Sequence, residues 1–103
     1  MYSTKNYHLT KGEEKFIKTF LQNNDCGAKT PKHLLQDNFS CQSIESLNEI
    51  FEDLSSKQIA GFLSSLINKM VIYVEEREED EGLPDLYWVN ENYLAELDKD
   101  MEF

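Results

Sequence analysis

The sequence predicts a single α+β domain that is mostly helical, with a three-helix core, a two-stranded β-hairpin and a C-terminal helix. The chain has 103 residues, which suits one domain, and 40% of them are hydrophobic, as in a globular protein. Apolar residues recur at helical spacing up to residue 70 and alternate from residue 71, as in a strand. We expect the domain, residues 1–103, to have its core over about residues 9–97 and frayed termini.

The first helix starts after Thr10. A threonine N-cap followed three residues later by a glutamate, here Glu13, forms a capping box. Turn-forming residues at 23–27 end this helix. Thr30 and Pro31 start a second, short helix, because proline fits the first helical position. The buried stripe of the first helix is predicted to comprise Phe16, Ile17, Phe20 and Leu21.

Two further helices follow residue 43. The first has apolar residues at helical spacing from Ile44 to Leu54. A second capping box, Ser55 with Gln58, starts the next helix. The buried stripe of that helix is predicted to comprise Ile59, Leu63, Leu66, Ile67 and Met70.

The hairpin and the last helix complete the predicted fold. Residues 71–74 form the outgoing strand, and residues 85–89, DLYWV, form the returning strand. Because strand side chains alternate between the two faces, one of Tyr87 and Trp88 must face the core. We expect Trp88 to be buried and Tyr87 to be exposed as an interface anchor. Asn90 caps the last helix.

Charge is distributed unevenly along the chain. The net charge is −10, yet residues 1–34 carry six lysines against three acids, whereas residues 35–103 carry seventeen acids against four basic residues. Within the hairpin, residues 75–81 hold six acids and one arginine. A surface that binds phosphates should be basic, so this charge argues against generic DNA binding. It suits either a solvated surface loop or a carboxylate array that docks on a basic protein surface.

Residues 60–72, AGFLSSLINKMVI, resemble the recognition-helix end of winged helix-turn-helix domains of the MarR type. Leu63 and Leu66 occupy the positions of two leucines that lie three residues apart in this family. Residues 71–72 occupy the positions of the aliphatic pair with which the family enters its wing. The resemblance covers roughly residues 9–90. It implies a winged helix in which the β-hairpin is the wing.

Two positions depart from the pattern of that family. Gly61 stands where the family often carries a basic residue, which removes a phosphate or base contact. Met70 stands where the family usually carries a turn-forming glycine. The join between helix and strand is therefore less typical of the family at Met70.

Three groups of residues are candidates for a binding surface. The exposed helix face contains polar side chains that can read base edges and small ones that let a protein partner approach closely. This face comprises Ser56, Lys57, Gln58, Gly61, Ser64, Ser65 and Asn68. The acidic wing comprises Glu75, Glu76, Arg77, Glu78, Glu79, Asp80, Glu81 and Tyr87. Lys29 and Lys32 are candidate phosphate contacts.

No pattern in the sequence indicates catalysis, a metal or a cofactor. The two cysteines and two histidines lack the spacing of zinc ligands, and the acidic segment does not match a calcium loop. No apolar run reaches the ~20 residues that span a bilayer, so no membrane segment is expected. The N-terminus lacks the apolar region of a signal peptide. With two cysteines, we expect a cytoplasmic protein with reduced thiols.

These observations favour one function and leave one alternative. We expect a small acidic, non-enzymatic regulatory or inhibitory protein that binds another protein, resembles the accessory proteins of phages and mobile elements, and mimics nucleic acid. The alternative is a sequence-specific DNA-binding transcriptional regulator that acts as a homodimer. DNA binding requires four lysines on the side of the helix over residues 56–68. These are Lys29, Lys32, Lys57 and Lys69.

Overall fold

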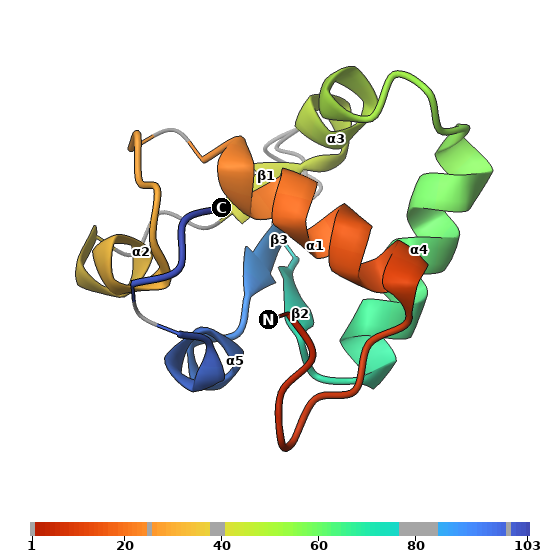
Figure 1. Cartoon of the computed structure of the whole chain (residues 1–103). Helices are drawn as coiled ribbons and strands as arrows, with labels where there is room; N and C mark the ends of the chain where they lie inside the picture. The colour runs from red at the N-terminus through yellow and green to blue at the C-terminus, as the bar shows by residue number, and fades with distance from the viewer. Residues whose placement is uncertain (1, 25, 38–40, 77–84, 99) are drawn as a thin grey trace.

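The computed structural model describes residues 2–24, 26–37, 41–76, 85–98 and 100–103. These residues form an α+β fold of helices and a small antiparallel sheet (Figure 1). In chain order the elements are α1 (Lys11–Gln22), α2 (Pro31–Asp37), β1 (Cys41–Ser43), α3 (Ile44–Ile50), α4 (Ser56–Asn68), β2 (Ile72–Glu75), β3 (Leu86–Val89) and α5 (Glu91–Glu96). Among the described residues, no helix is long and apolar enough to cross a bilayer.

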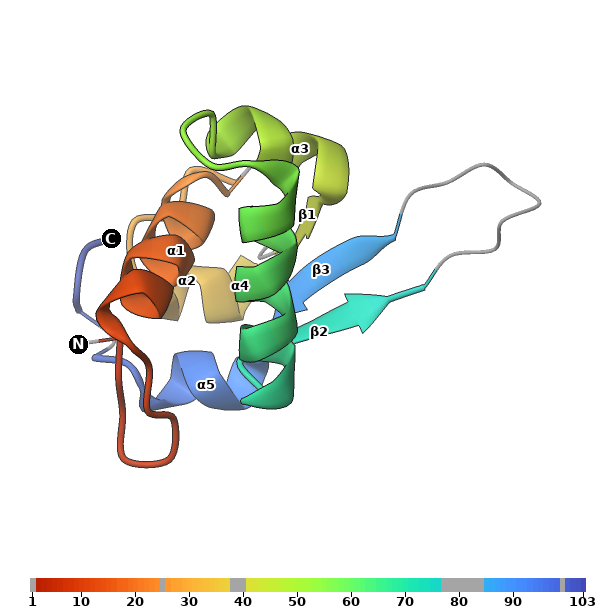
Figure 2. The same cartoon turned by 90° about the vertical axis from the view of Figure 1, so that its right-hand side faces the viewer.

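Helices α1, α3 and α4 pack against one another, and α2 and α5 contact each other on the other side of the molecule (Figure 1). Helix α4 also packs against β2, and α3 packs against β1. Strands β2 and β3 run outward from the helices (Figure 2). The hairpin is therefore anchored at its base by α4.

The sheet has three antiparallel strands in the order β1-β3-β2. Trp88 of β3 lies between Cys41 of β1 and Tyr73 of β2. The sequence predicted only the two strands of the hairpin, so β1 corrects that prediction. Strand β1 is three residues long, which is too short for the alternation that identifies a strand in a sequence. The antiparallel pairing of residues 41–43 with β3 is what identifies this segment as a strand.

Both predicted capping boxes are confirmed. At the start of α1, the backbone N–H of Glu13 donates to Thr10 Oγ1 (3.1 Å), and the backbone N–H of Thr10 donates to Glu13 Oε1 (2.8 Å). At the start of α4, the backbone N–H of Gln58 donates to Ser55 Oγ (3.1 Å), and that of Ser55 donates to Gln58 Oε1 (2.8 Å). Each box satisfies two backbone donors, which fixes where the helix begins.

The core lies where α1, α4 and the sheet meet. Leu63 and Leu66 are buried, as predicted, with 3% and 0% of their surfaces exposed. Phe16 of α1 stacks on Phe51, which follows α3, with ring centroids 4.3 Å apart. Full burial of a side chain of this size stabilises the fold by about 1.5–3 kcal/mol. The largest fully buried side chains are Tyr93, Phe16, Phe20, Ile17, Leu21 and Leu34.

Described residues near both ends of the chain pack against the core. Tyr2 is buried, and its carbonyl accepts a hydrogen bond from the Tyr93 hydroxyl at 2.7 Å. Met101 and Phe103 pack against the core, and the backbone N–H of Phe103 donates to the carbonyl of Lys29 at 2.9 Å. Aromatic residues near the two ends supply apolar surface whose burial favours order.

The orientation of β3 is the reverse of the predicted one. Tyr87 packs against the core on the same face as Val89, whereas Trp88 lies on the other face beside Tyr73. Tyr87 is paired with Gln42, which is itself buried. The general preference of tryptophan for burial suggested the opposite arrangement. Strand register sets the face of every side chain at once, and here it outweighs that preference.

Met70 forms the turn between α4 and β2. It was predicted to belong to the buried stripe of the helix, but its side chain is 68% exposed. Its φ angle is 63°, in the left-handed region where glycine is the ordinary residue. The change of backbone direction at Met70 turns its side chain away from the core and lets the chain enter β2.

Candidate binding site on helix α4

Helix α4 presents different side chains to each of its neighbours. Its apolar stripe, Ile59, Leu63 and Leu66, enters the core. Phe62 and Ser65 lie on the side that faces α1, where Phe62 stacks on an aromatic ring of α1. The remaining side faces solvent and the hairpin. Because residues three and four apart share a helix face, Ser64 and Asn68 lie together on this third side.

A buried carboxylate joins α4 to the start of α1. Glu13 is 3% exposed. It accepts hydrogen bonds from Lys69 Nζ (2.5 Å), Ser65 Oγ (2.5 Å) and the backbone N–H of Thr10 (2.8 Å). Burial raises the pKa of this carboxyl, but the three hydrogen bonds and the positive charge of Lys69 outweigh burial and lower the pKa to about 2. The ionised carboxylate therefore ties the two helices together at neutral pH.

This contact removes Ser65 from the predicted helix face and Lys69 from the lysines that DNA binding would require. Ser65 was predicted to lie on the exposed face of α4, but its hydroxyl donates to Glu13. Lys69 pairs with Glu13 and also donates to the carbonyl of His8 at 3.0 Å. Glu13 and Lys69 are 56 positions apart in the chain, so no local sequence signal could have revealed the pair.

A groove of about 270 Å³ lies beside the outer side of α4, toward β3. It brings together residues from two of the groups predicted from the sequence, namely Ser64 and Asn68 of the helix face and Tyr87 of the acidic wing. Apolar side chains from α3 and α4 complete its wall. The lining residues are Ile44, Ala60, Leu63, Ser64, Ile67, Asn68 and Tyr87. A hydroxyl, an amide and a phenol beside apolar surface suit the side chains of a protein partner.

The first turns of α4 are open to solvent. Ser56, Lys57 and Gly61 are exposed, and a Cβ atom at Gly61 would meet no other atom within 4 Å. Gln58 is also exposed, but its side-chain carbonyl accepts the backbone N–H of Ser55 in the capping box. Since Gln58 is committed to this cap, it is less available for reading a base edge than the sequence suggested.

The described part of the hairpin is acidic. Glu75 and Glu76 are exposed, and Glu75 Oε2 accepts the indole N–H of Trp88 at 2.9 Å. The other acidic-wing positions, residues 77–81, lie outside the described residues. Residues 41–76 hold six acids against two lysines, so the side of the molecule formed by α3, α4 and β2 carries a net negative charge.

The predicted phosphate contacts lie far from this surface. Lys32 belongs to α2, and Lys29 precedes that helix. Helix α2 lies on the opposite side of the molecule from α4 (Figure 1). Lys29 and Lys32 are exposed there, so they cannot act on the same ligand face as Lys57 of α4.

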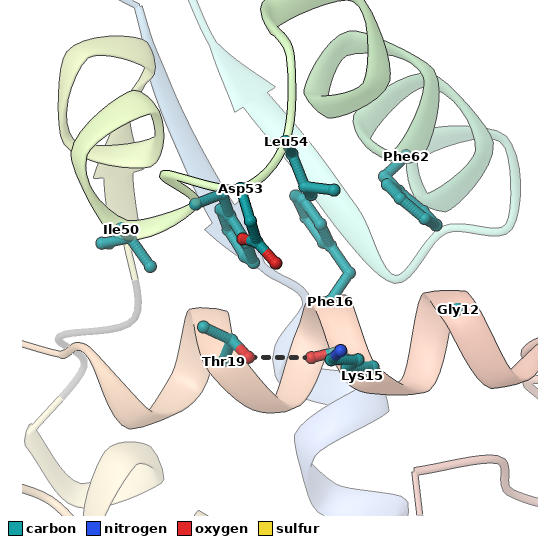
Figure 3. A pocket seen from close by; sticks show the side chains of 9 residues that line it. Gly12, Lys15, Phe16, Thr19, Ile50, Asp53, Leu54 and Phe62 are labelled. Carbon is teal, nitrogen blue, oxygen red and sulfur yellow. Dashed lines mark hydrogen bonds between the residues drawn. The ribbon is translucent and has the colours of Figure 1, made fainter.

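A second hollow, which the sequence did not predict, lies between α1 and the turn from α3 to α4 (Figure 3). Its volume is about 260 Å³. Phe16 stacks on both Phe51 and Phe62, with ring centroids 4.3 and 5.1 Å apart. These rings come from three segments, so only the folded chain brings them together. The lining residues are Gly12, Lys15, Phe16, Thr19, Ile50, Phe51, Asp53, Leu54 and Phe62.

Neither a metal site nor a relative identifies the chemistry of this chain. Among the described residues, no group of three or more His, Cys, Asp or Glu side chains could hold a metal ion. No model of a known protein family matches the sequence, and no curated protein and no solved structure is significantly similar to it.

Proposed function

We propose that this chain is a small winged-helix protein that regulates or inhibits another protein by binding it, without catalysis. The docking surface is the outer side of α4, the groove beside β3 and the acidic hairpin. The order of α1, α3, α4 and the β2–β3 hairpin supports a winged-helix fold, with α4 in the place of the recognition helix. The partner offers a basic surface, because the hairpin and its surroundings are acidic.

The positions of four lysines carry this proposal. Lys69 is paired with Glu13, and Lys29 and Lys32 lie on the side of α2. Of the four, Lys57 alone stands on the outer side of α4. A duplex placed against α4 would meet one of these cations and the acidic hairpin. DNA affinity depends on neutralising several phosphates, so the charge of this surface favours a protein ligand.

The groove beside α4 supports the same conclusion. Tyr87 and Asn68 lie next to partly buried Ile44 and Ile67. Aromatic and aliphatic surface with a few hydrogen-bonding groups at its edge is the composition of a protein interface. A side chain of the partner that entered this groove would serve as the anchor of the complex.

A sequence-specific DNA-binding regulator is the second candidate. It is favoured by Ser56 and Lys57 at the exposed start of α4. The Ser56 hydroxyl could meet a base edge there, and the Lys57 ammonium a phosphate. The two candidates differ in the sign of the charge that their ligands carry.

Neutralising the hairpin separates the two candidates. Changing Glu75, Glu76, Glu78 and Glu79 to Gln removes four negative charges from the hairpin. For a basic protein partner, this change slows association, most at low salt, because charges are screened over about 8 Å at physiological ionic strength. For DNA, the same change removes repulsion and strengthens binding. The fold should survive, because exposed charges contribute little stability.

Both affinities are measured on one variant. Partner proteins are captured from a nuclease-treated lysate of the source cells, and DNA binding is followed by anisotropy with duplexes of random and selected sequence. A matched control changes four exposed glutamates outside the hairpin to Gln, namely Glu45, Glu49, Glu52 and Glu102. Unchanged partner capture together with stronger, sequence-specific DNA binding by the hairpin variant contradicts the proposal and supports the DNA-binding regulator.

A further inference from the structure

The sheet carries an aromatic surface on the face turned away from α4. Tyr73 of β2 is 49% exposed and pairs directly with Trp88 of β3 across the antiparallel ladder. The two rings are nearly parallel, with an angle of 10° between their planes and centroids 6.5 Å apart. Both belong to the face opposite to Ile72 and Val89, which are buried in the core. The two rings therefore lie next to each other on this face of the sheet.

Carboxylates lie beside these rings. Glu75 Oε2 accepts the indole N–H of Trp88 at 2.9 Å, which orients the indole and places a negative charge at its rim. Burial raises the pKa of the Tyr73 hydroxyl, and the negative charges of Glu91 and Glu75 raise it further. Both carboxylates therefore add negative potential at Tyr73. Glu75 and Glu91 are themselves exposed.

We propose that this surface, formed by Tyr73, Trp88, Glu75 and Glu91, binds an arginine side chain on a basic segment of a partner protein. The face of an aromatic ring attracts a cation. A guanidinium is planar and weakly hydrated, so it can stack on a ring while it pairs with a carboxylate in two parallel hydrogen bonds. The site lies on the other face of the sheet from the α4 groove, but it shares Glu75 with the acidic hairpin and in that respect rests on the proposed function. Failure to bind an arginine peptide would overturn this site alone, whereas the α4 groove is tested by partner capture.

The charge of the groups around the rings distinguishes an arginine side chain from a nucleic-acid base, which is the other common ligand of paired aromatic rings. Exposed rings also stack on the bases of single-stranded nucleic acid. Nucleic-acid sites of that kind surround the rings with cations that follow the phosphates. Among the residues that the structure describes, the charged groups that act on the rings are the carboxylates of Glu75 and Glu91, which repel phosphates and attract a guanidinium.

The single tryptophan of the chain gives this site a direct readout. The full-length protein is titrated with a capped peptide of alternating glycine and arginine, and the fluorescence of Trp88 is followed. A peptide with citrulline in place of arginine keeps the shape of the side chain and removes its charge. We expect a saturable change with the arginine peptide, binding at least tenfold weaker with the citrulline peptide, and intermediate binding with a lysine peptide.

Two variants test the two parts of the site. Tyr73→Leu keeps an apolar side chain on the strand and removes the ring, and it should weaken arginine-peptide binding roughly two- to fivefold, the factor for an exposed cation–π contact. Glu75→Gln keeps an acceptor for the Trp88 indole and removes the charge, so it should weaken binding and reduce its dependence on salt. Glu49→Gln removes the same charge from α3 and should have little effect.

Any of the following three outcomes would overturn the proposal. A fluorescence change that is absent up to millimolar peptide, or equal for arginine and citrulline, excludes recognition of a guanidinium. Equal effects of Glu75→Gln and Glu49→Gln would show that net charge alone attracts the peptide. A response to a thymidine oligonucleotide that exceeds the response to the arginine peptide would identify a nucleic-acid site. Thermal melts of both site variants are used to check that the fold is kept.

Discussion

The change Glu13→Gln tests how much the buried contact between α1 and α4 stabilises the fold. Glutamine has nearly the same shape and can still complete the capping box at Thr10. It cannot form the ion pair with Lys69, and it accepts weaker hydrogen bonds than a carboxylate. The variant therefore removes the charge of Glu13 while it leaves the start of α1 intact.

The pKa of Glu13 gives the expected magnitude. Folding lowers this pKa from 4.5 to about 2, which corresponds to roughly 3 kcal/mol of stability. Because the pKa is lower in the folded state, this stability is fully present above about pH 4.5 and is lost as the pH falls toward 2. Glu13→Gln should therefore reduce the free energy of unfolding by about 2–3 kcal/mol at pH 7 and by little near pH 2.

Urea denaturation from pH 7 to pH 2, followed by circular dichroism, measures this difference. The matched control is Glu52→Gln, which removes one exposed carboxylate outside the contact and should change the unfolding free energy by less than about 0.5 kcal/mol. Lys69→Met leaves Glu13 with the hydrogen bonds from Ser65 and Thr10 but without a cation, so its pH dependence should move to higher pH. Equal urea midpoints for Glu13→Gln and the unmodified protein at pH 7 would refute the reasoning, as would a difference that stays constant down to pH 2.

Three further changes test the core, the turn after α4 and its outer side. Leu66→Ala should lower the unfolding free energy by about 2–5 kcal/mol, because Leu66 is 0% exposed, and an unchanged thermal melt would mean that α4 packs on a different face. Met70→Gly should raise it by about 0.5–1 kcal/mol, since glycine accepts the φ of 63° without strain; a loss of stability in urea would show that the Met70 side chain contributes packing. Gly61→Arg should fold well, because no atom lies within 4 Å of a Cβ there, and it should weaken partner capture while strengthening DNA binding in anisotropy. Stronger capture of the partner by Gly61→Arg would place the docking surface elsewhere.

Local chemistry made the helix starts predictable from the sequence. The capping boxes at Thr10 and Ser55 and the N-cap at Asn90 lie where the sequence places them, because each depends on residues two or three positions apart. The periodic apolar stripes of α1 and α4 were predictable for the same reason, since a helix repeats its face every three or four residues. The sequence also shows that the hairpin is acidic, because charge does not depend on the fold.

Tertiary pairing decided the features that the sequence left open or predicted wrongly. Strand β1 exists because it pairs with β3, and the register of β3 puts Tyr87 against the core and Trp88 outside. Glu13 takes Ser65 out of the predicted helix face and pairs with Lys69, one of the lysines that DNA binding would require. The fold of α2 carries Lys29 and Lys32 away from α4. These outcomes depend on contacts between residues far apart in the chain. Helix starts and net charge follow from neighbouring residues, whereas the face that each side chain presents is set by the packing of whole elements against one another.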